Sequence, residues 1–202
     1  MSRSDVLVDA DYVEARIGAP GTVIVEVDED TSAYDKGHIP SAIKIDWKKD
    51  LQDPVRRDFV DKVGFETLLS ERGISNDDTV VLYGGNNNWF AAYAYWYFRV
   101  YGHQNVKLLD GGRKKWELES RELVTEVPQR AAASYTAADP DASIRAFRDE
   151  VVAEVPLGAD GGFRFFAAPG SWTLRVLAPG GIRAEQVVSA AIGQIANLEV
   201  AV

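Results

Sequence analysis

The sequence predicts an α/β fold, in which a parallel sheet carries helices on both faces, over residues 5–125. Short apolar segments rich in β-branched residues alternate with helix-length segments, and short polar links join them. The chain has 202 residues, of which 46% are hydrophobic, so it can bury one full core. A short, poorly defined C-terminal tail is expected to follow the sheet.

Four short segments have the composition of buried parallel strands. Each is mostly apolar, contains β-branched or aliphatic residues, and is followed by polar residues or glycine. The predicted strands are Val23–Val27, Ile43–Asp46, Thr79–Tyr83 and Val106–Leu109.

Four helices are predicted around these strands. Asp9 is a candidate N-cap for the first, Gly73 ends the second, and Gly102 ends the third. The third is apolar or aromatic nearly all round, which indicates a helix packed on both sides. The polar segment Asp50–Asp61 is predicted to be a surface loop. The predicted helices are Asp9–Ile17, Asp61–Arg72, Trp89–Tyr101 and Arg113–Leu118.

The segment Thr79–Gly102 joins the central strand to the longest helix through a polar loop. Backbone N–H groups of such a loop, at the carboxyl edge of a parallel sheet and at the start of a helix, favour an anion. The asparagine side chains could equally cap the loop, because asparagine tolerates left-handed geometry. The candidate anion-binding residues are Gly84, Gly85, Asn86, Asn87 and Asn88.

Composition argues against several function classes. The formal charge of −9 argues against nonspecific nucleic-acid binding. No window is long and apolar enough to span a membrane, and the N-terminus lacks the apolar core of a signal peptide, so a cytoplasmic location is expected. The sequence contains no cysteine, which excludes disulfides, thiolate metal sites and thiol nucleophiles. No carboxylates or histidines are spaced for metal binding or acid–base catalysis, so no metal or cofactor is expected.

Two histidines and two charged clusters have structural interpretations. His38 lies in a turn and is expected to bond local backbone rather than a substrate anion. His103 follows the end of a helix, where a structural role is expected. Asp28–Asp30 follows the first strand and is interpreted as a solvated loop, with a place in a cleft as the alternative. A basic patch, interpreted as a solvated helix face, comprises Lys107, Arg113, Lys114 and Lys115.

The third predicted helix carries an aromatic stripe, interpreted as core and domain interface rather than as a cofactor site. Without a second domain to cover it, part of the stripe is expected to be exposed. A protein partner or self-association could then use it. The stripe comprises Trp89, Phe90, Tyr93, Tyr95, Trp96, Tyr97 and Phe98.

Two stretches resemble signatures of the rhodanese family. Val23–Asp46 is similar to the strand, acidic turn and G-H-I-P-x-A run that open rhodanese domains, and Val106–Trp116 resembles the D-G-G-x-x-x-W segment that follows the active-site loop. Over residues 5–150, the order and spacing of these motifs resemble the N-terminal half of a tandem-domain thiosulfate sulfurtransferase.

The resemblance implies sulfur transfer from thiosulfate to cyanide or another thiophile, with small anionic sulfur compounds as ligands. In that family a cysteine thiolate at the end of the central strand becomes a persulfide, and in tandem members it lies in the second domain. Here the strand-end position is Tyr83, and a phenol with an ordinary pKa near 10 is a poor nucleophile at neutral pH. No catalytic residue is therefore expected, and the first domain resembles the non-catalytic half.

The composition changes after residue 125, and the match to the family runs through Ser143–Ala153 and then stops. Residues 126–142 have the composition of a linker, and residues 143–202 are interpreted as a truncated or aberrant start of a second rhodanese-like domain. The change to a Gly- and Ala-rich segment without lysine suggests that the reading frame was lost near Ala153. A helix from about Asp149 is predicted in this part, together with strands at Phe163–Ala168 and Thr173–Leu177 and an amphipathic helix at Ala184–Leu198.

Three functions remain open: a sulfurtransferase by family, an inactive rhodanese module that binds a partner or an anion, and a truncated product without function. The missing cysteine separates the first from the other two, because sulfane sulfur needs a thiolate to carry it.

Overall fold

In a computed structural model of the chain, the structure describes residues 3–53 and 58–145. In the C-terminal part it describes residues 158, 162–163, 167, 169–178, 181–191, 193–195 and 197–200. The chain divides into two compact units, Met1–Phe147 and Arg148–Val202.

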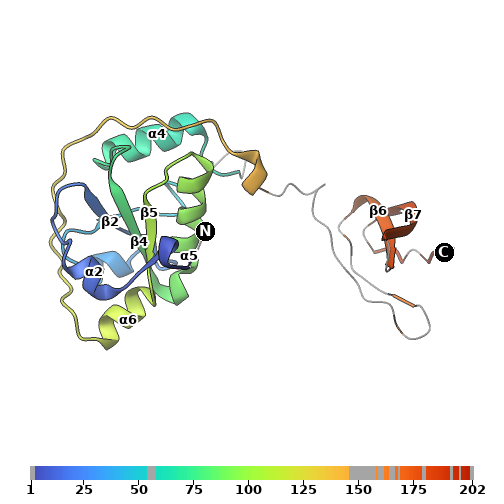
Figure 1. Cartoon of the computed structure of the whole chain (residues 1–202), viewed down its shortest axis with the longest axis horizontal. Coiled ribbons are helices and arrows are strands. Elements are labelled where there is room, and N and C mark those ends of the chain that lie inside the picture. Colours follow the sequence, from blue (N-terminus) through green and yellow to red (C-terminus); the bar gives the residue numbers. More distant parts are fainter. Residues whose placement is uncertain are drawn as a thin grey trace. The chain divides into compact units, whose positions relative to one another are not determined.

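The first unit contains a parallel sheet of five strands in the order β1-β5-β4-β2-β3 (Figure 1). All four predicted strands are present, although the one predicted at Ile43–Asp46 ends at Lys44. The edge strand β1 was not predicted, because two residues are too few to show a pattern. The strands are β1 (Leu7–Val8), β2 (Thr22–Glu26), β3 (Ile43–Lys44), β4 (Thr79–Tyr83) and β5 (Val106–Leu109).

The four predicted helices are present, although the first ends at Glu14 rather than Ile17, and Asp9 is the N-cap as predicted. The side chain of Asp9 accepts from the Tyr12 N–H, and that of Asp61 accepts from the Gly64 N–H. No helix within the described residues is long and apolar enough to cross a membrane. The helices are α1 (Arg3–Val6), α2 (Ala10–Glu14), α3 (Ala33–Lys36), α4 (Lys62–Glu71), α5 (Gly85–Val100) and α6 (Gly112–Leu118), with a 3₁₀ turn η1 (Ala142–Ile144).

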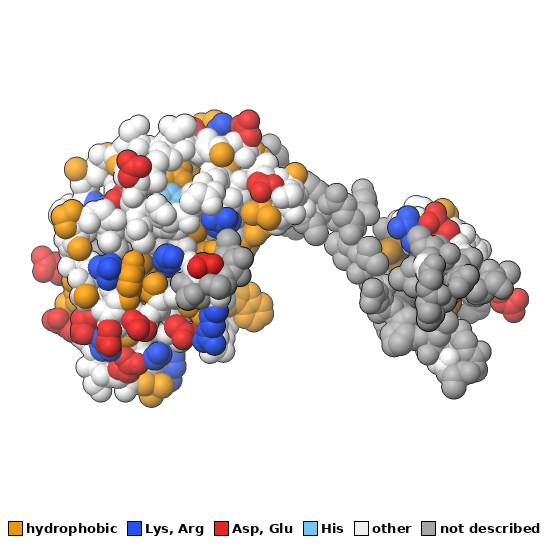
Figure 2. All heavy atoms as spheres, in the orientation of Figure 1, with side chains coloured by type: hydrophobic (Ala, Val, Ile, Leu, Met, Phe, Trp, Pro, Cys, Tyr) orange, Lys and Arg blue, Asp and Glu red, His pale blue; other side chains and the backbone are white. Residues whose placement is uncertain are grey.

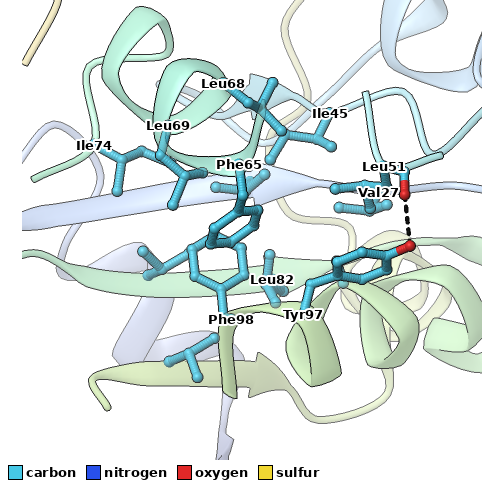
Figure 3. Packing of buried hydrophobic residues seen from close by; sticks show 14 of the residues in the cluster. Val27, Ile45, Leu51, Phe65, Leu68, Leu69, Ile74, Leu82, Tyr97 and Phe98 are labelled. Atoms are coloured by element: carbon cyan, nitrogen blue, oxygen red, sulfur yellow. Dashed lines mark hydrogen bonds between the residues drawn. The ribbon is translucent and has the colours of Figure 1, made fainter. Parts of the chain in front are cut away.

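Helices cover both faces of the sheet, as predicted. One face packs against α4 and α5 through a cluster that includes Val25, Phe65 and Phe98. The other packs against α2 and α6 through a cluster that includes Ile24 and Trp116. Figure 3 shows Phe65 and Phe98 meeting edge to face, with ring centroids 5.3 Å apart. Successive side chains of a strand point to opposite faces of the sheet, so the neighbouring residues Ile24 and Val25 pack in different clusters.

The segment Asp50–Asp61, predicted as a surface loop, takes part in the core. Leu51 is fully buried, and its carbonyl accepts a hydrogen bond of 2.5 Å from the Tyr97 hydroxyl (Figure 3). The Val60 N–H also bonds to the Leu51 carbonyl. Because most residues of this segment are polar or charged, its composition does not indicate that Leu51 is buried.

Residues 126–141, called the strap below, contain no helix or strand, yet they run against the outside of the first unit (Figure 1). The Ala133 N–H donates to the Ser70 carbonyl, and the Ala138 N–H donates to the Tyr101 carbonyl. Tyr135 is 5% exposed and packs edge to face on Phe65. The strap is therefore an integral part of the first unit.

The second unit contains one antiparallel hairpin, formed by β6 (Gly170–Ala178) and β7 (Gly181–Ala190). The strand predicted at Thr173–Leu177 lies within β6. The helix predicted at Ala184–Leu198 is wrong, since residues 184–190 belong to β7. The β-branched Val187 and Val188 favour a strand, and pairing with β6 outweighs the weak helical pattern.

The other predictions for this unit are largely outside the described residues. The helix predicted from about Asp149 lies wholly outside them. Of the strand predicted at Phe163–Ala168, only Phe163 and Ala167 are described, and neither is in a strand.

We expect Tyr135→Ala to lower the free energy of unfolding by about 3–5 kcal/mol, because it removes a buried ring from the contact with Phe65. The matched change Tyr135→Phe removes only the hydroxyl near His103 and should cost about 1 kcal/mol. Urea denaturation of both variants measures the difference. A change within about 0.5 kcal/mol for Tyr135→Ala would mean that the strap is a free linker.

Candidate functional site

The candidate site lies at the carboxyl ends of β2 and β4, where α5 and α6 begin. Glu26 and Tyr83 are the last residues of these two strands and are paired in register. Gly84 and the first four residues of α5, three of which are not in a right-handed helical conformation, form a loop at residues 84–88. Parallel α/β sheets place ligand sites at this edge.

The loop has an unusual backbone. Asn86, Asn87 and Asn88 all lie in the left-handed region, with φ of 45°, 56° and 62°. Asparagine adopts this conformation more readily than most residues because its short side chain can bond local backbone. The Asn88 Nδ2 donates to the Leu109 carbonyl at 2.7 Å, and the Asn86 Nδ2 donates to Glu29 Oε2 at 2.8 Å. These anchors hold the loop in one shape.

Position 84 requires glycine because there is no room for a side chain. Its backbone is extended, with φ of −171°, so no left-handed strain is involved. A Cβ atom on this residue would lie 2.2 Å from the Val27 carbonyl oxygen. No side chain, and hence no nucleophile, fits at position 84 without moving β2.

Gly112, the second glycine of the D-G-G segment, also allows a close approach to the loop. A Cβ there would lie 2.3 Å from Asn88 Oδ1 and 2.6 Å from the Gly84 carbonyl oxygen. Its φ of 55° adds a conformational reason for glycine. The start of α6 is therefore packed directly on the loop.

Internal acceptors bind two of the N–H groups in the predicted anion cup. The Gly84 N–H donates to Asn88 Oδ1 at 3.0 Å. The Gly85 N–H donates to Asp28 Oδ2 at 2.6 Å. The nearest carboxylate to the cup thus belongs to the chain itself, and it would repel an external anion.

Beneath the loop, Glu26 is the centre of a buried polar cluster. Its side chain is 1% exposed, and Oε2 accepts from the Tyr83 hydroxyl at 2.5 Å and from Arg113 Nη2 at 2.5 Å. The Tyr83 oxygen in turn accepts from the Ile39 N–H at 3.0 Å. The cluster joins β2, β4, the turn at residue 39 and α6.

Arg113 is the positive member of this cluster. Its side chain is 11% exposed, and its Nε lies 3.6 Å from Asp28 Oδ2. The Arg113 N–H also donates to the Gly84 carbonyl at 3.0 Å. Glu26 Oε1 and Arg113 Nε are buried without a hydrogen-bond partner within the described residues. The opposite charges of Glu26 and Arg113 therefore stabilise the cluster, although not every polar atom in it has a hydrogen bond.

Two interpretations of charged residues are corrected by this geometry. Arg113 was assigned to a solvated helix face, but its side chain turns inward to Glu26. Asp28 was interpreted as part of a solvated loop, but it is buried beside Arg113. Glu29 and Asp30 are exposed. Of the remaining patch, Lys114 is exposed.

Burial is the largest single influence on the pKa values of Glu26, Tyr83 and Arg113. It raises the pKa of the Glu26 carboxyl and outweighs the hydrogen bonds from Arg113 and Tyr83, which lower it. Burial, together with the charge of Glu26, raises the pKa of the Tyr83 phenol well above 10. For Arg113, burial acts to lower the pKa, but the hydrogen bond and charge of Glu26 outweigh it and raise the pKa. Tyr83 therefore stays neutral and cannot act as a nucleophile at neutral pH.

Both histidines have structural contacts. His38 is fully buried, with Nδ1 2.9 Å from the Tyr34 carbonyl, which confirms the predicted local backbone bond. Its Nε2 lies 3.0 Å from the Glu126 carbonyl, so it also holds the start of the strap. His103 Nε2 lies 3.0 Å from the Asp78 carbonyl, and burial lowers the pKa of this imidazole.

Besides the loop, a metal site or a second pocket could bind a ligand in the part of the chain that the structure describes. Within the described residues, no group of three or more His, Asp or Glu side chains could hold a metal ion. A groove of about 500 Å³ lies between β3, the end of α4 and the strap, and charges of both signs line it. Its lining does not include residues 84–88.

Residues 9–119 match the family model described as a rhodanese-like domain, which is more than half of the chain. The chain belongs to the rhodanese family. Residues 136–202 match a second model, described as a protein of unknown function (DUF1416).

Curated relatives extend the family match. Over 155 residues the chain is 71% identical to the "Putative thiosulfate sulfurtransferase" of Mycolicibacterium smegmatis, covering 77% of this chain and 56% of the relative. Over 151 residues it is 50% identical to the "Sulfur carrier protein TtuD" of Thermus thermophilus, covering 75% of this chain and 53% of the relative. The chain thus spans a little over half the length of these relatives.

Solved structures show the same fold at lower identity. SseA of Escherichia coli, described as a 3-mercaptopyruvate sulfotransferase, matches with a TM-score of 0.60 and 24% identity, over 66% of this chain and 55% of SseA. Tum1 of Saccharomyces cerevisiae matches with a TM-score of 0.56 and 20% identity, over 68% of this chain and 51% of Tum1. At these identities the likeness establishes the fold alone.

We expect Glu26→Gln to destabilise the protein by about 3 kcal/mol or more, because it leaves the Arg113 guanidinium with Asp28 as its one buried carboxylate partner among the ion pairs of the described residues. Glu117→Gln is the matched control. Glu117 lies 3.7 Å from Arg113 and is 41% exposed, so its loss should cost less than about 1 kcal/mol. Chemical denaturation measures both, and equal costs would contradict a structural role for the buried pair.

We expect Gly84→Ala to lower the free energy of unfolding by about 1–3 kcal/mol, because its Cβ would overlap the Val27 carbonyl. Gly84→Cys should be destabilised similarly. Ala92→Ser, an exposed change on α5, should remain within about 0.5 kcal/mol of wild type. Thermal and urea unfolding measure the set, and a fully stable Gly84→Ala protein would show that the loop has room for a side chain.

Proposed function

We propose that this chain is a non-catalytic rhodanese module of the thiosulfate sulfurtransferase lineage. On this proposal, it does not itself carry sulfane sulfur from thiosulfate to cyanide or another thiophile. One observation carries the proposal: nothing at the end of β4 can form a persulfide. The chain has no cysteine, and position 84 has no room for a side chain.

The chemistry of the loop supports this proposal. Sulfane-sulfur transfer needs a thiolate nucleophile stabilised by nearby N–H groups. At this site the Tyr83 hydroxyl donates to Glu26, and its pKa is raised well above 10. The Gly85 N–H is bonded to the Asp28 carboxylate. The buried cluster thus serves the stability of the sheet edge.

The relatives support thiosulfate chemistry for the lineage, as the name of the Mycolicibacterium protein states. Since this chain spans little more than half of these relatives, the activity and substrates of the whole proteins are proposals here. Small anionic sulfur compounds remain the proposed ligand class. The cytoplasmic location and the absence of nucleic-acid and membrane partners remain predictions.

A binding role is the second candidate, and the surface of α5 favours it. Trp89 is 67% exposed, more than any other aromatic side chain among the described residues. Such a residue is a candidate anchor for a protein partner.

We also propose that residues 143–202 are a genuine second module rather than an out-of-frame reading. The second family match over residues 136–202 and the regular hairpin of β6 and β7 support this proposal. Sequencing the surrounding genomic region would test it. A complete second rhodanese domain in another frame would overturn it.

The activity test is a thiocyanate assay with thiosulfate and cyanide, using the purified chain. We expect a rate equal to that of the reaction without protein, because no thiolate is present to accept sulfur. The full-length Mycolicibacterium smegmatis relative serves as a parallel sample for the assay.

The contrary outcome has a clear form. Thiocyanate production that scales with the amount of this chain, and that persists through a second purification step, would overturn the proposal. Alkylation with iodoacetamide separates a contaminant from the chain, since only a contaminating cysteine enzyme would lose activity.

A further inference from the structure

The chain has two histidines, and each of them contacts the strap. His38 is fully buried and lies at the start of the strap, and His103 is 3% exposed and lies beside Tyr135. Figure 2 accordingly shows little histidine surface on the face that it draws. Both imidazoles are internal attachment points, so the number of protons on each ring decides which contacts it can make.

Both ring nitrogens of His38 face carbonyl oxygens. Nδ1 lies 2.9 Å from the Tyr34 carbonyl, and Nε2 lies 3.0 Å from the Glu126 carbonyl. A carbonyl oxygen can only accept, and a neutral imidazole carries one N–H, so the neutral ring satisfies one of these two contacts. The imidazolium has an N–H on each nitrogen and donates to both. The geometry of the contacts therefore favours two protons on this ring.

A buried positive charge is costly unless its surroundings compensate it. The Tyr34 ring stacks on His38 with ring centroids 3.7 Å apart and planes 2° apart, and an aromatic face attracts a cation. The charge of Glu26 reaches the same place, since burial and then this charge raise the pKa of the Tyr34 phenol to about 12. Two carbonyl oxygens, an aromatic face and a carboxylate therefore stabilise a cation at His38.

Ionisable groups lie on each of the elements that contact Tyr34, His38 or Ile39. The basic groups have acidic partners of their own, because Lys44 pairs with Asp35, Arg113 with Glu26 and Arg72 with Asp50. Their repulsion of an imidazolium is reduced by these partners. The ionisable groups are Tyr34 and Asp35 on α3, Lys44 on β3, Glu26 on β2, Tyr83 on β4, Arg72 at the end of α4, Arg113 on α6 and Glu126 in the strap.

His103 differs from His38 in what its nitrogens face. Nε2 lies 3.0 Å from the Asp78 carbonyl, and Nδ1 lies 3.2 Å from the Tyr135 hydroxyl. Because a hydroxyl can donate to a bare nitrogen, one proton on Nε2 satisfies both contacts. Burial lowers the pKa of this imidazole and outweighs the backbone bonds to Asp78 and Asn105. The ionisable groups that act on His103 or Tyr135 are Asp78, Arg99 and Glu66.

We propose that His38 is a buried imidazolium that anchors the start of the strap, and that loss of its second proton releases the strap at Glu126. Once one ring nitrogen is bare, its lone pair faces a carbonyl oxygen and the contact is lost. The attachment at Tyr135 remains, because His103 needs only one proton. Residues 127–130 form one side of the groove beside β3, so release at Glu126 alters that groove.

The sign of the pH dependence follows from proton linkage. The closed strap binds the second His38 proton more tightly than the open strap does. Closure is therefore most stable below the ordinary imidazole pKa of about 6.5 and weakens as the pH rises. His103 has the opposite sign, since its lowered pKa makes its contribution complete above that value. Of the two histidines, only His38 responds to a rise in pH from neutral.

The first test is nitrogen NMR of the full chain with isotope-labelled histidine at neutral pH. Tyr135→Phe removes the hydroxyl beside His103 and should shift the ring signals of that histidine alone, which assigns both rings. We expect both nitrogens of His38 to carry a proton, and His103 to carry one on Nε2 only. A His38 ring with a bare nitrogen at neutral pH would overturn the proposal.

The second test is amide hydrogen exchange of the full chain, measured as protection factors from neutral to mildly alkaline pH. The Val124 N–H donates to the His38 carbonyl and reports on the His38 anchor. The Ala133 N–H donates to the Ser70 carbonyl beside the other attachment, and the Val27 N–H donates to the Tyr83 carbonyl in the core. We expect protection of Val124 to fall about tenfold or more, while the other two stay constant.

Two variants separate the histidines. His38→Gln has no titratable group at position 38 and should remove the pH response of Val124. Tyr135→Phe leaves the His38 contacts in place and should keep that response. The NMR test of the unaltered chain stands even if His38→Gln fails to fold.

Protection of Val124 that is constant with pH, or that falls together with that of Val27, would overturn the proposal. Loss of the response in Tyr135→Phe would assign it to His103 and would also overturn it. The thiocyanate assay does not depend on these measurements, so either this proposal or the proposed function can fail without the other.

Discussion

The buried pair between Glu26 and Arg113 is the contact on which the arrangement of the sheet edge depends. It joins the end of β2 to the start of α6, and Tyr83 adds the end of β4 through its hydroxyl. Placing two charges in a protein interior costs desolvation energy, which only close pairing offsets. The space beneath the loop is filled by a fixed polar cluster.

The glycines around this cluster follow from the same constraint. The loop passes so close to β2 and α6 that Gly84 and Gly112 have no room for a Cβ atom. Three consecutive asparagines then turn the chain through left-handed geometry. The Asn86 amide donates to Glu29, and the Asn88 amide donates to the Leu109 carbonyl. The carboxylate of Asp28, which follows β2, accepts from the Gly85 N–H of this loop.

Much of the first unit could be predicted from sequence because its signals are local. Apolar β-branched runs located β2 and β4, and Asp9 and Asp61 marked two helix starts. The Glu26–Arg113 pair could not be predicted, since 87 residues separate its members and no pattern links them. A glutamate within an apolar strand was the available sign that a buried partner exists. The strap was missed because much of its attachment uses backbone groups, which leave little trace in composition.

The attachment of the strap has a consequence for folding during synthesis. A ribosome releases the chain from its N-terminus, and domains generally fold as units. The sheet and all six of its described helices precede residue 119, yet the ring that closes over Phe65 belongs to Tyr135. Until that last segment emerges, the Phe65 ring on the α4 side of the nascent domain lacks the cover that Tyr135 provides.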